Sequence, residues 1–163
     1  MSVDASIYLR IVEYKTGVVI SPTETLKILL RNGWRVISDN GEAFYKSLNV
    51  NGDDDISNWI TGKISLPELM KIFEEKEQKG ELIGVMMTWQ DTSIGGGVLL
   101  YREKEMHQKN IHTSMTFSLD SDRQLIPNIE PFKITDVNWY LTKLLPAFNQ
   151  GDTVVEHFTY EEL

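Results

Sequence analysis

The chain of 163 residues contains no cysteine. Disulfide bonds, thiolate nucleophiles and cysteine-ligated zinc are therefore excluded. No apolar run approaches the roughly 20 residues that a membrane-spanning helix requires. The N-terminal residues carry an early charge, Asp4, and no apolar core of the length that a secretory signal needs. A reducing compartment suits such a chain, so we expect a cytoplasmic protein without a membrane segment.

Residues that commonly bind metal or carry catalysis are also few. The three histidines, His107, His112 and His157, lack the spacing of a metal site. No Gly-x-Ser-x-Gly sequence supports a nucleophilic serine. The acidic runs 53–55 and 120–122 lack the glycine and the glutamate that a calcium loop needs at its sixth and twelfth positions, so we interpret both as turns. We expect no cofactor, no metal and no enzymatic activity. A pair of carboxylates for glycoside hydrolysis stays open, because their separation depends on the fold.

Basic side chains are the minority. The sequence has 16 Lys and Arg against 24 Asp and Glu, which gives a net charge of −8. A surface of this charge repels phosphate backbones, so we do not expect nucleic-acid binding. It attracts basic proteins and speeds their encounter, although many proteins are this acidic only for solubility.

The strongest structural signal is the stretch Glu81–Arg102. Two apolar runs, 82–89 and 98–101, flank a polar break, which predicts the middle hairpin of a sheet. Three glycines, Gly95–Gly97, stand inside it, and each weakens a strand by roughly 0.5–1 kcal/mol relative to alanine. A bulge, a wide turn or an aromatic ring packed on bare backbone would explain them. A phosphate-binding loop would need a following helix and usually a lysine, and neither is present.

Further strands are predicted by apolar residues at alternate positions or by short apolar runs. They cover residues 7–12, 18–20, 34–37, 42–48, 111–119 and 153–160. Residues 7–12 and 18–20 should form one hairpin. Residues 34–37 and 42–48 should form another around Asn40-Gly41, a dipeptide typical of hairpin turns.

Three helices are predicted from their first residues. Ser21 precedes Pro22, Ser65 precedes Leu66 and Pro67, and each serine has a glutamate three residues on, which is typical of a capped helix start. Thr135 should begin the third helix. The spacing of Ile56, Trp59 and Ile60 favours a short helical turn capped by Asp55.

These elements predict one α+β domain over residues 1–163. Hairpin connections dominate, so the sheet should be mainly antiparallel, with about six to eight strands and about three helices on one face.

In size, acidity, lack of cysteine and α+β pattern, the whole chain resembles the immunity proteins that bacteria pair with polymorphic or contact-dependent toxins. The resemblance implies a cytosolic inhibitor that binds one toxin domain, often a basic nuclease, and masks its active site. Acidic loops would mimic nucleic-acid phosphates in such a complex. The net charge of −8 and the lack of a catalytic motif agree with this function.

An apolar anchor with a charged rim is typical of a protein-binding hot spot, and the acidic loop before Trp59 fits that description. The residues that we expect to contact a basic partner are Asp53, Asp54, Asp55, Trp59, Asp120 and Asp122. The alternative for Trp59 is burial beside Ile56 and Ile60.

Two other functions stay open. The chain could be a small enzyme or ligand-binding domain with its site near Gly95–Gly97, and would then show converging polar groups with perturbed pKa values. It could also be a phage or host accessory protein with a structural partner. An inhibitor should instead present a broad acidic face.

Overall fold

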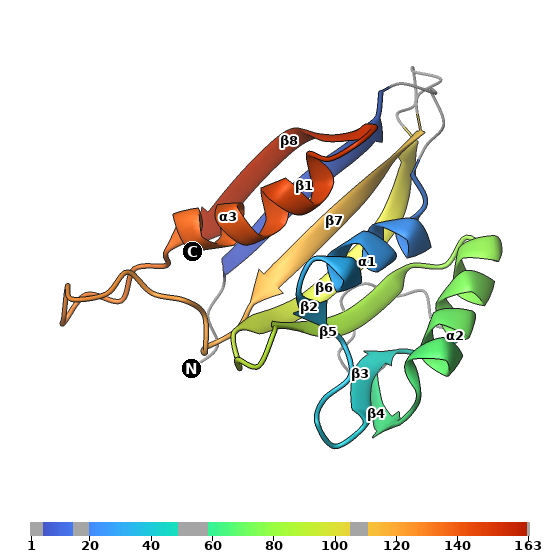
Figure 1. Ribbon diagram of the computed structural model, residues 1–163, viewed down its shortest axis with the longest axis horizontal. Coiled ribbons are helices and arrows are strands. Elements are labelled where there is room, and N and C mark those ends of the chain that lie inside the picture. The colour runs from blue at the N-terminus through green and yellow to red at the C-terminus, as the bar shows by residue number, and fades with distance from the viewer. Residues whose placement is uncertain (1–4, 15–19, 49–58, 105–110, 163) are drawn as a thin grey trace.

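Antiparallel pairing joins eight strands into one sheet, and three helices pack against it (Figure 1). The computed structural model describes residues 5–14, 20–48, 59–104 and 111–162. The strands are β1 (Ala5–Glu13), β2 (Trp34–Arg35), β3 (Glu42–Lys46), β4 (Trp59–Lys63), β5 (Ile83–Trp89), β6 (Gly95–Lys104), β7 (Ile111–Leu119) and β8 (Thr153–Glu162). The helices are α1 (Pro22–Arg31), α2 (Leu66–Gln78) and α3 (Val137–Phe148). The predicted α+β class is confirmed.

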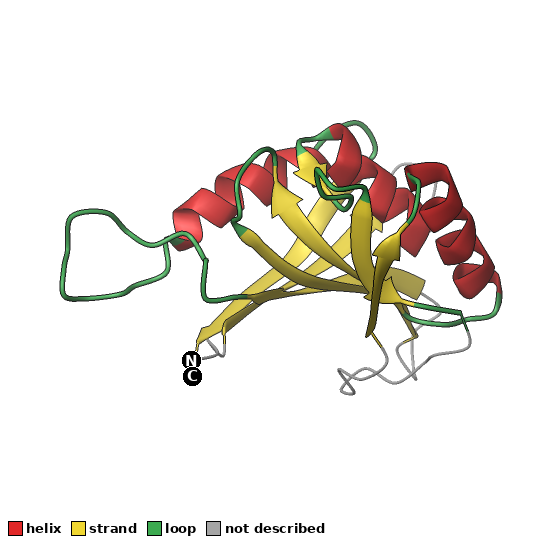
Figure 2. Ribbon diagram, turned by 90° about the horizontal axis from the view of Figure 1, so that it is seen from below, coloured by secondary structure: helices red, strands yellow, loops and turns green. Residues whose placement is uncertain are grey.

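The strand order is β4-β3-β5-β6-β7-β1-β8, and β2 pairs with β5. The three helices lie on one face of this twisted sheet, and the opposite face carries no helix of the described residues (Figure 2). The sheet therefore has a helix-covered face and an open face. The edges of the sheet are β4 and β8, which lie far apart in both sequence and space.

The core lies between the helices and the covered face. In β1 the alternate residues Ile7, Leu9 and Ile11 are fully buried, as the period-two pattern predicts. Ile7 pairs with Phe117 of β7, which is also fully buried, so neighbouring strands direct their apolar side chains to the same face. Leu26 of α1 completes this layer.

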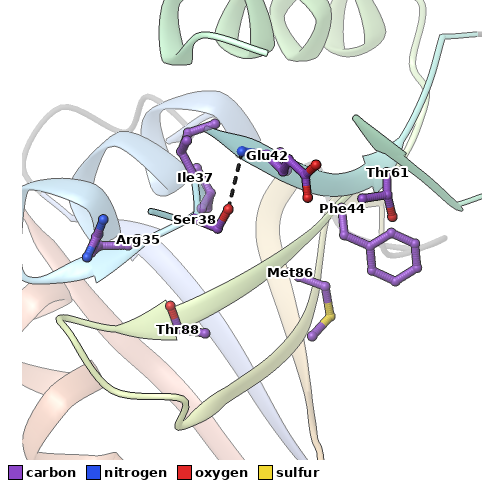
Figure 3. A pocket seen from close by; sticks show the side chains of 10 residues that line it. Arg35, Ile37, Ser38, Glu42, Phe44, Thr61, Met86 and Thr88 are labelled. Atoms are coloured by element: carbon purple, nitrogen blue, oxygen red, sulfur yellow. Dashed lines mark hydrogen bonds between the residues drawn. The ribbon is translucent and has the colours of Figure 1, made fainter. Parts of the chain in front are cut away.

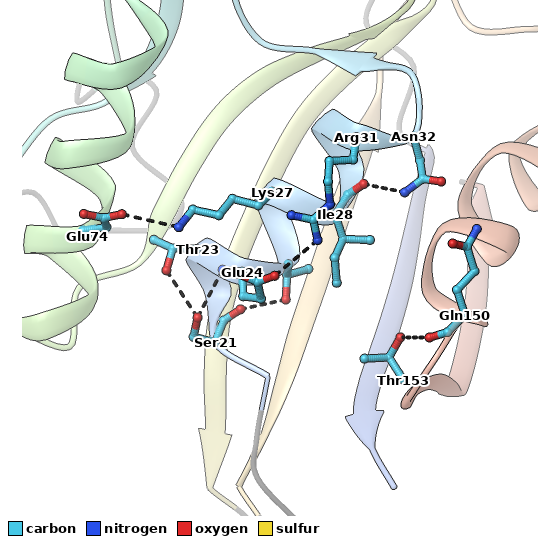
Figure 4. Close-up of polar contacts among 11 residues, drawn as sticks. Ser21, Thr23, Glu24, Lys27, Ile28, Arg31, Asn32, Glu74, Gln150 and Thr153 are labelled. Atoms are coloured by element: carbon cyan, nitrogen blue, oxygen red, sulfur yellow. Dashed lines mark hydrogen bonds and ion pairs between the residues drawn. The ribbon is translucent and has the colours of Figure 1, made fainter. Parts of the chain in front are cut away.

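Two helix starts form as predicted. Ser21 Oγ accepts a hydrogen bond from the backbone N–H of Glu24 at 3.1 Å (Figure 4), and Ser65 Oγ accepts one from Glu68 at 3.3 Å. These bonds satisfy N–H groups that lack a partner within the helix. The third start is one residue later than predicted. Asp136, not Thr135, caps α3 and accepts from Trp139 N–H at 3.1 Å.

The predicted hairpin between residues 7–12 and 18–20 is wrong. β7 occupies one edge of β1 from Ala5 to Ile11, and β8 occupies the other edge along the whole strand. No edge of residues 7–11 is left for a third strand. Residues 15–19 lie outside the described residues. β1 pairs with β7 and β8 because these long strands bury more apolar surface beside it than a strand of three residues could.

The second predicted hairpin is also wrong, although its turn forms. Gly41 has a φ of +75°, and its N–H donates to Ser38 O at 2.9 Å. The segments on either side of this turn do not form a ladder with each other. Instead both pair with β5, through Trp34↔Trp89 and Tyr45↔Val85. The turn residues set the local geometry, whereas burial of Trp34 in the core sets the strand partner.

The helical turn predicted around Trp59 is wrong. Residues 59–63 form the edge strand β4, which runs antiparallel to β3 with Trp59 opposite Lys46 and Ile60 opposite Tyr45. Ile60 is exposed rather than packed beside Trp59. The helical spacing was misleading because three apolar positions fit either period over so short a segment. The proposed cap, Asp55, lies outside the described residues.

Candidate protein-binding surface

Trp59 lies on the open face of the sheet and is half-buried. Its ring centroid is 5.1 Å from that of Phe44, and the ammonium of the buried Lys46 lies 5.6 Å from the Trp59 ring. The ring also lies 3.8 Å from the position that a Cβ atom on Gly97 of β6 would occupy. These contacts give Trp59 a packing role within the domain. Its predicted role as a partner anchor stays a prediction, since Asp53, Asp54 and Asp55 lie outside the described residues.

The three glycines have a structural explanation. A Cβ atom on Gly95 would lie 1.9 Å from Met87 O, and one on Gly96 would lie 1.9 Å from Ser118 O. No side chain fits between β6 and its two neighbours at these positions. A Cβ on Gly97 would lie 3.8 Å from the Trp59 ring, an ordinary van der Waals distance, so the ring is next to this glycine but does not require it. The glycines belong to β6 itself, and the next described element along the chain is the strand β7.

A hollow of about 210 Å³ lies where the chain between β2 and β3 leaves the edge of β5 (Figure 3). Met86 and Thr88 line it, and these residues pair with Gly97 and Gly95, so the hollow is next to the glycine stretch. Two of its polar side chains are already engaged, and Ser38 Oγ accepts a hydrogen bond from Glu42 N–H at 3.2 Å. The Arg35 guanidinium bonds to Asp39 and to Asp91, each at 3.0 Å.

A larger hollow of about 470 Å³ lies between the start of α1 and the end of α2. Its carboxylates also have partners within the chain. Glu77 accepts from Thr23 N–H at 3.1 Å and from Thr23 Oγ1 at 2.9 Å, and Glu81 is 3.6 Å from Lys76 Nζ. Among the residues that the structure describes, no group of three His, Asp or Glu side chains could hold a metal ion.

The second acidic candidate is a tight turn directly after β7. Asp120 Oδ1 accepts a hydrogen bond from Asp122 N–H at 2.9 Å, and the backbone carbonyl of Asp120 accepts from Arg123 N–H at 3.2 Å. Burial raises the pKa of the Asp120 carboxyl. The hydrogen bond from Asp122 N–H opposes this rise, whereas the charge of Asp122 adds to it. Asp122 itself is exposed. The predicted turn is confirmed.

The sheet brings this turn to the C-terminal end of β8. Ala5 of β1 pairs with Leu119 on one side and with Glu162 on the other, so both strand ends lie in one row across the sheet. The Arg123 guanidinium spans the gap and lies 3.3 Å from the Glu162 carboxylate. No local sequence signal predicts this neighbourhood, because these residues are far apart in the chain.

From the same end of the molecule, residues 124–135 project away from both the sheet and the helices (Figures 1 and 2). We refer to these residues as the projecting loop. Its two arms are held together by a bridge between Leu125 and Thr135 and by the hydrogen bond from Ile126 N–H to Ile134 O at 2.9 Å. At the tip, Phe132 N–H donates to Ile129 O at 3.0 Å.

The projecting loop exposes large apolar side chains. Phe132 is 68% exposed, Ile134 49% and Ile126 40%. Pro127 and Pro131 interrupt residues 124–133, so the sequence predicts only irregular structure there. Its exposure could not be predicted from the sequence, since apolar residues are by default assigned to the core.

The negative charge is concentrated in the same part of the chain. Residues 120–163 contain eight Asp and Glu against three Lys and Arg, so this quarter of the sequence carries −5 of the net −8. These residues form the turn, the projecting loop, α3 and β8. Asp152 and Glu156 lie at the opposite end of β8, beside the end of β1. The other six carboxylates lie in or next to the projecting loop, and we call them the acidic base: Asp120, Asp122, Glu130, Asp136, Glu161 and Glu162. An apolar tip beside these carboxylates is the combination of anchor and charged rim expected for a protein-binding surface.

Comparison with models of known protein families, with characterised protein sequences and with solved structures found no match. No helix in the described part of the chain is long and apolar enough to cross a membrane.

Proposed function

We propose that this chain is a non-enzymatic inhibitor of the immunity-protein type, which binds a basic protein domain and blocks its activity. One observation carries the proposal. Within residues 120–163, the carboxylates Asp120, Asp122, Glu130, Asp136, Glu161 and Glu162 lie at the end of the molecule where exposed apolar side chains project, against the basic Arg123 and Lys133. A toxin domain such as a nuclease, whose site must be basic to hold phosphate, is a partner of matching charge.

The acidic base would act on the rate of encounter. Carboxylates such as Asp122, Glu130 and Glu161 are exposed, and none of the three has an ion pair among the described contacts. Long-range attraction between such a surface and a basic domain raises the association rate and is screened by salt. The acidic run of Asp53, Asp54 and Asp55 would supply a second acidic region that raises the association rate by the same charge attraction.

The test begins with copurification of untagged partners and their identification by mass spectrometry. Binding kinetics of the recovered partner are then measured against two matched variants, each with three fewer charges. One is Asp122→Asn with Glu130→Gln and Glu161→Gln, and the other replaces residues 53–55 with Asn. We expect the first variant to reduce the association rate and flatten its salt dependence, while denaturant melts stay unchanged.

The outcomes separate the surfaces. If only the second variant, or Trp59→Ala, weakens binding, the interface is the open-face end of β4 rather than the acidic base. If the recovered partner binds with no salt dependence, or is not basic, the proposed function is wrong. The hollow beside Gly95–Gly97 would then be the next candidate, as the site of a small ligand.

A further inference from the structure

We propose that the projecting loop is an insertion element, and that Phe132 enters an apolar pocket within a cleft of the basic partner. This inference rests on the proposed function and names the surface that performs it. The partner site that fits is concave, because a narrow projecting ribbon complements a cleft better than a flat surface. Its rim is basic, because carboxylates surround the base of the loop.

The tip of the projecting loop is exposed. Phe132 leaves about two thirds of its surface in water, at 68% exposed, and Ile126 and Ile134 lie on the two hydrogen-bonded arms beside it. A single exposed apolar residue is ordinary, but three on one projecting ribbon form a patch of the kind that marks interaction sites. Aromatic side chains that are buried only in a complex dominate binding energy.

Hydrogen bonds hold the projecting loop in place where it joins the domain. The Arg123 side chain is only 9% exposed. Its Nε donates to Thr135 Oγ1 at 2.8 Å, and its Nη2 donates to Lys133 O at 3.3 Å while pairing with Glu162. The Tyr140 hydroxyl accepts from Gln124 N–H at 3.0 Å on the other arm.

These bonds fix the arms before a partner arrives. An ordered loop loses little conformational entropy on binding, so the contact surface of Phe132 contributes more of its apolar burial to affinity. Arg123 is therefore a positioning residue for the tip.

Charge distinguishes among the partners that could bind this tip. Lys133 is the sole basic side chain between residues 124 and 135, and a chain of net charge −8 is repelled by anionic lipid and by a second copy of itself. The same charge attracts a basic domain. We therefore propose a basic protein as the partner. Binding to a membrane and self-association are alternatives that the experiment must detect.

The experiment places the photo-crosslinker p-benzoyl-phenylalanine at position 132 in the full chain, in cells that contain the protein naturally. The control places it at Ile60, which is 43% exposed on the opposite sheet edge. A basic protein crosslinked from position 132 and not from position 60 supports the inference. Crosslinks from position 132 to lipid, to a second copy of the chain, or to nothing overturn it.

Kinetics with the purified partner provide the second measurement. Phe132→Ala should raise the dissociation rate by about 30-fold or more, the effect of losing a hot-spot anchor, and leave the association rate nearly unchanged. Ile60→Ala should change neither rate. Arg123→Gln should weaken binding although Phe132 is intact. It should also speed amide exchange at Ile126. If Arg123 does not position the loop, neither change should appear.

The two proposals can fail separately. If the partner binds with the expected salt dependence but Phe132→Ala and Ile60→Ala are equivalent, the insertion element is wrong and the inhibitor proposal stands. If position 132 crosslinks to a protein that is not basic and binds independently of salt, the proposed function is wrong. Binding of the wild-type chain, but not of Phe132→Ala, to vesicles of phosphatidylcholine and phosphatidylglycerol would overturn the inference directly.

Discussion

Tyr140 offers a quantitative test of how the base of the projecting loop is built. Its side chain is fully buried in α3, and burial raises the pKa of its hydroxyl from 10.0 to about 12 against the opposing hydrogen bond from Gln124 N–H. Tyr140→Phe removes both the titrating group and the acceptor for that N–H. At neutral pH the substitution should cost about 1 kcal/mol of unfolding free energy, the net value of one hydrogen bond.

At alkaline pH the sign of the difference reverses. Between pH 10 and 12 the unfolded chain ionises Tyr140 while the folded chain keeps it protonated, so the wild-type protein loses stability as pH rises through this window. At pH 11, ionisation of Tyr140 favours the unfolded chain over the folded chain by a factor of about ten. This factor corresponds to a loss of about 1.4 kcal/mol of unfolding free energy. Tyr140→Phe lacks this loss, so its stability should fall less steeply and approach or pass that of the wild type.

The assay is a series of urea melts followed by tryptophan fluorescence from pH 8 to 11.5. The pKa of Tyr160 is also raised by burial, but both proteins contain Tyr160 and its effect cancels in the comparison. Parallel curves of unfolding free energy against pH would refute the reasoning, because they would show that the folded and unfolded chains ionise Tyr140 alike. No loss of stability at neutral pH would refute the hydrogen bond to Gln124.

Two further predictions concern the fold. Ser21→Ala and Ser65→Ala should each lower the unfolding free energy by roughly 0.5–2 kcal/mol through loss of a helix cap. An unchanged melting midpoint for either variant would show that its serine does not stabilise the helix start. Gly96→Ala should cost at least roughly 1–3 kcal/mol, because the new Cβ would overlap Ser118 O, whereas Gly62→Ala on β4 meets no atom within 4 Å and should leave stability the same or slightly higher. Equal effects of the two glycine substitutions in denaturant melts would contradict the close approach of β6 and β7.

Local signals were sufficient for most elements. Ser21 and Ser65 begin helices because their hydroxyls accept from N–H groups three residues on, and that bond depends only on residues within one turn. The alternation in β1 and β7 was readable because side chains alternate across any strand. Even the turn at Gly41 was predicted, since it depends on a backbone conformation that glycine adopts freely.

Strand partners were not readable from the same signals. β1 was expected to pair with the segment after it, but its neighbours are β7 and β8. β2 and β3 were expected to pair with each other, but both lie against β5. Backbone hydrogen bonds are chemically alike for every strand, so the choice of partner depends on which arrangement buries the most apolar surface in the whole domain.

Some features of the candidate surface also follow from the sequence, and others only from the tertiary structure. The sequence alone determined the net charge of −8, the absence of cysteine chemistry, the acidic turn at Asp120 and Asp122 and the α+β class. Only the tertiary structure decided that this turn lies beside Glu162 and that Phe132 stands in solvent. Charge and local turns are properties of neighbouring residues. Exposure and proximity depend on how β1 joins β7 to β8, and this pairing of distant segments is set by their shared core.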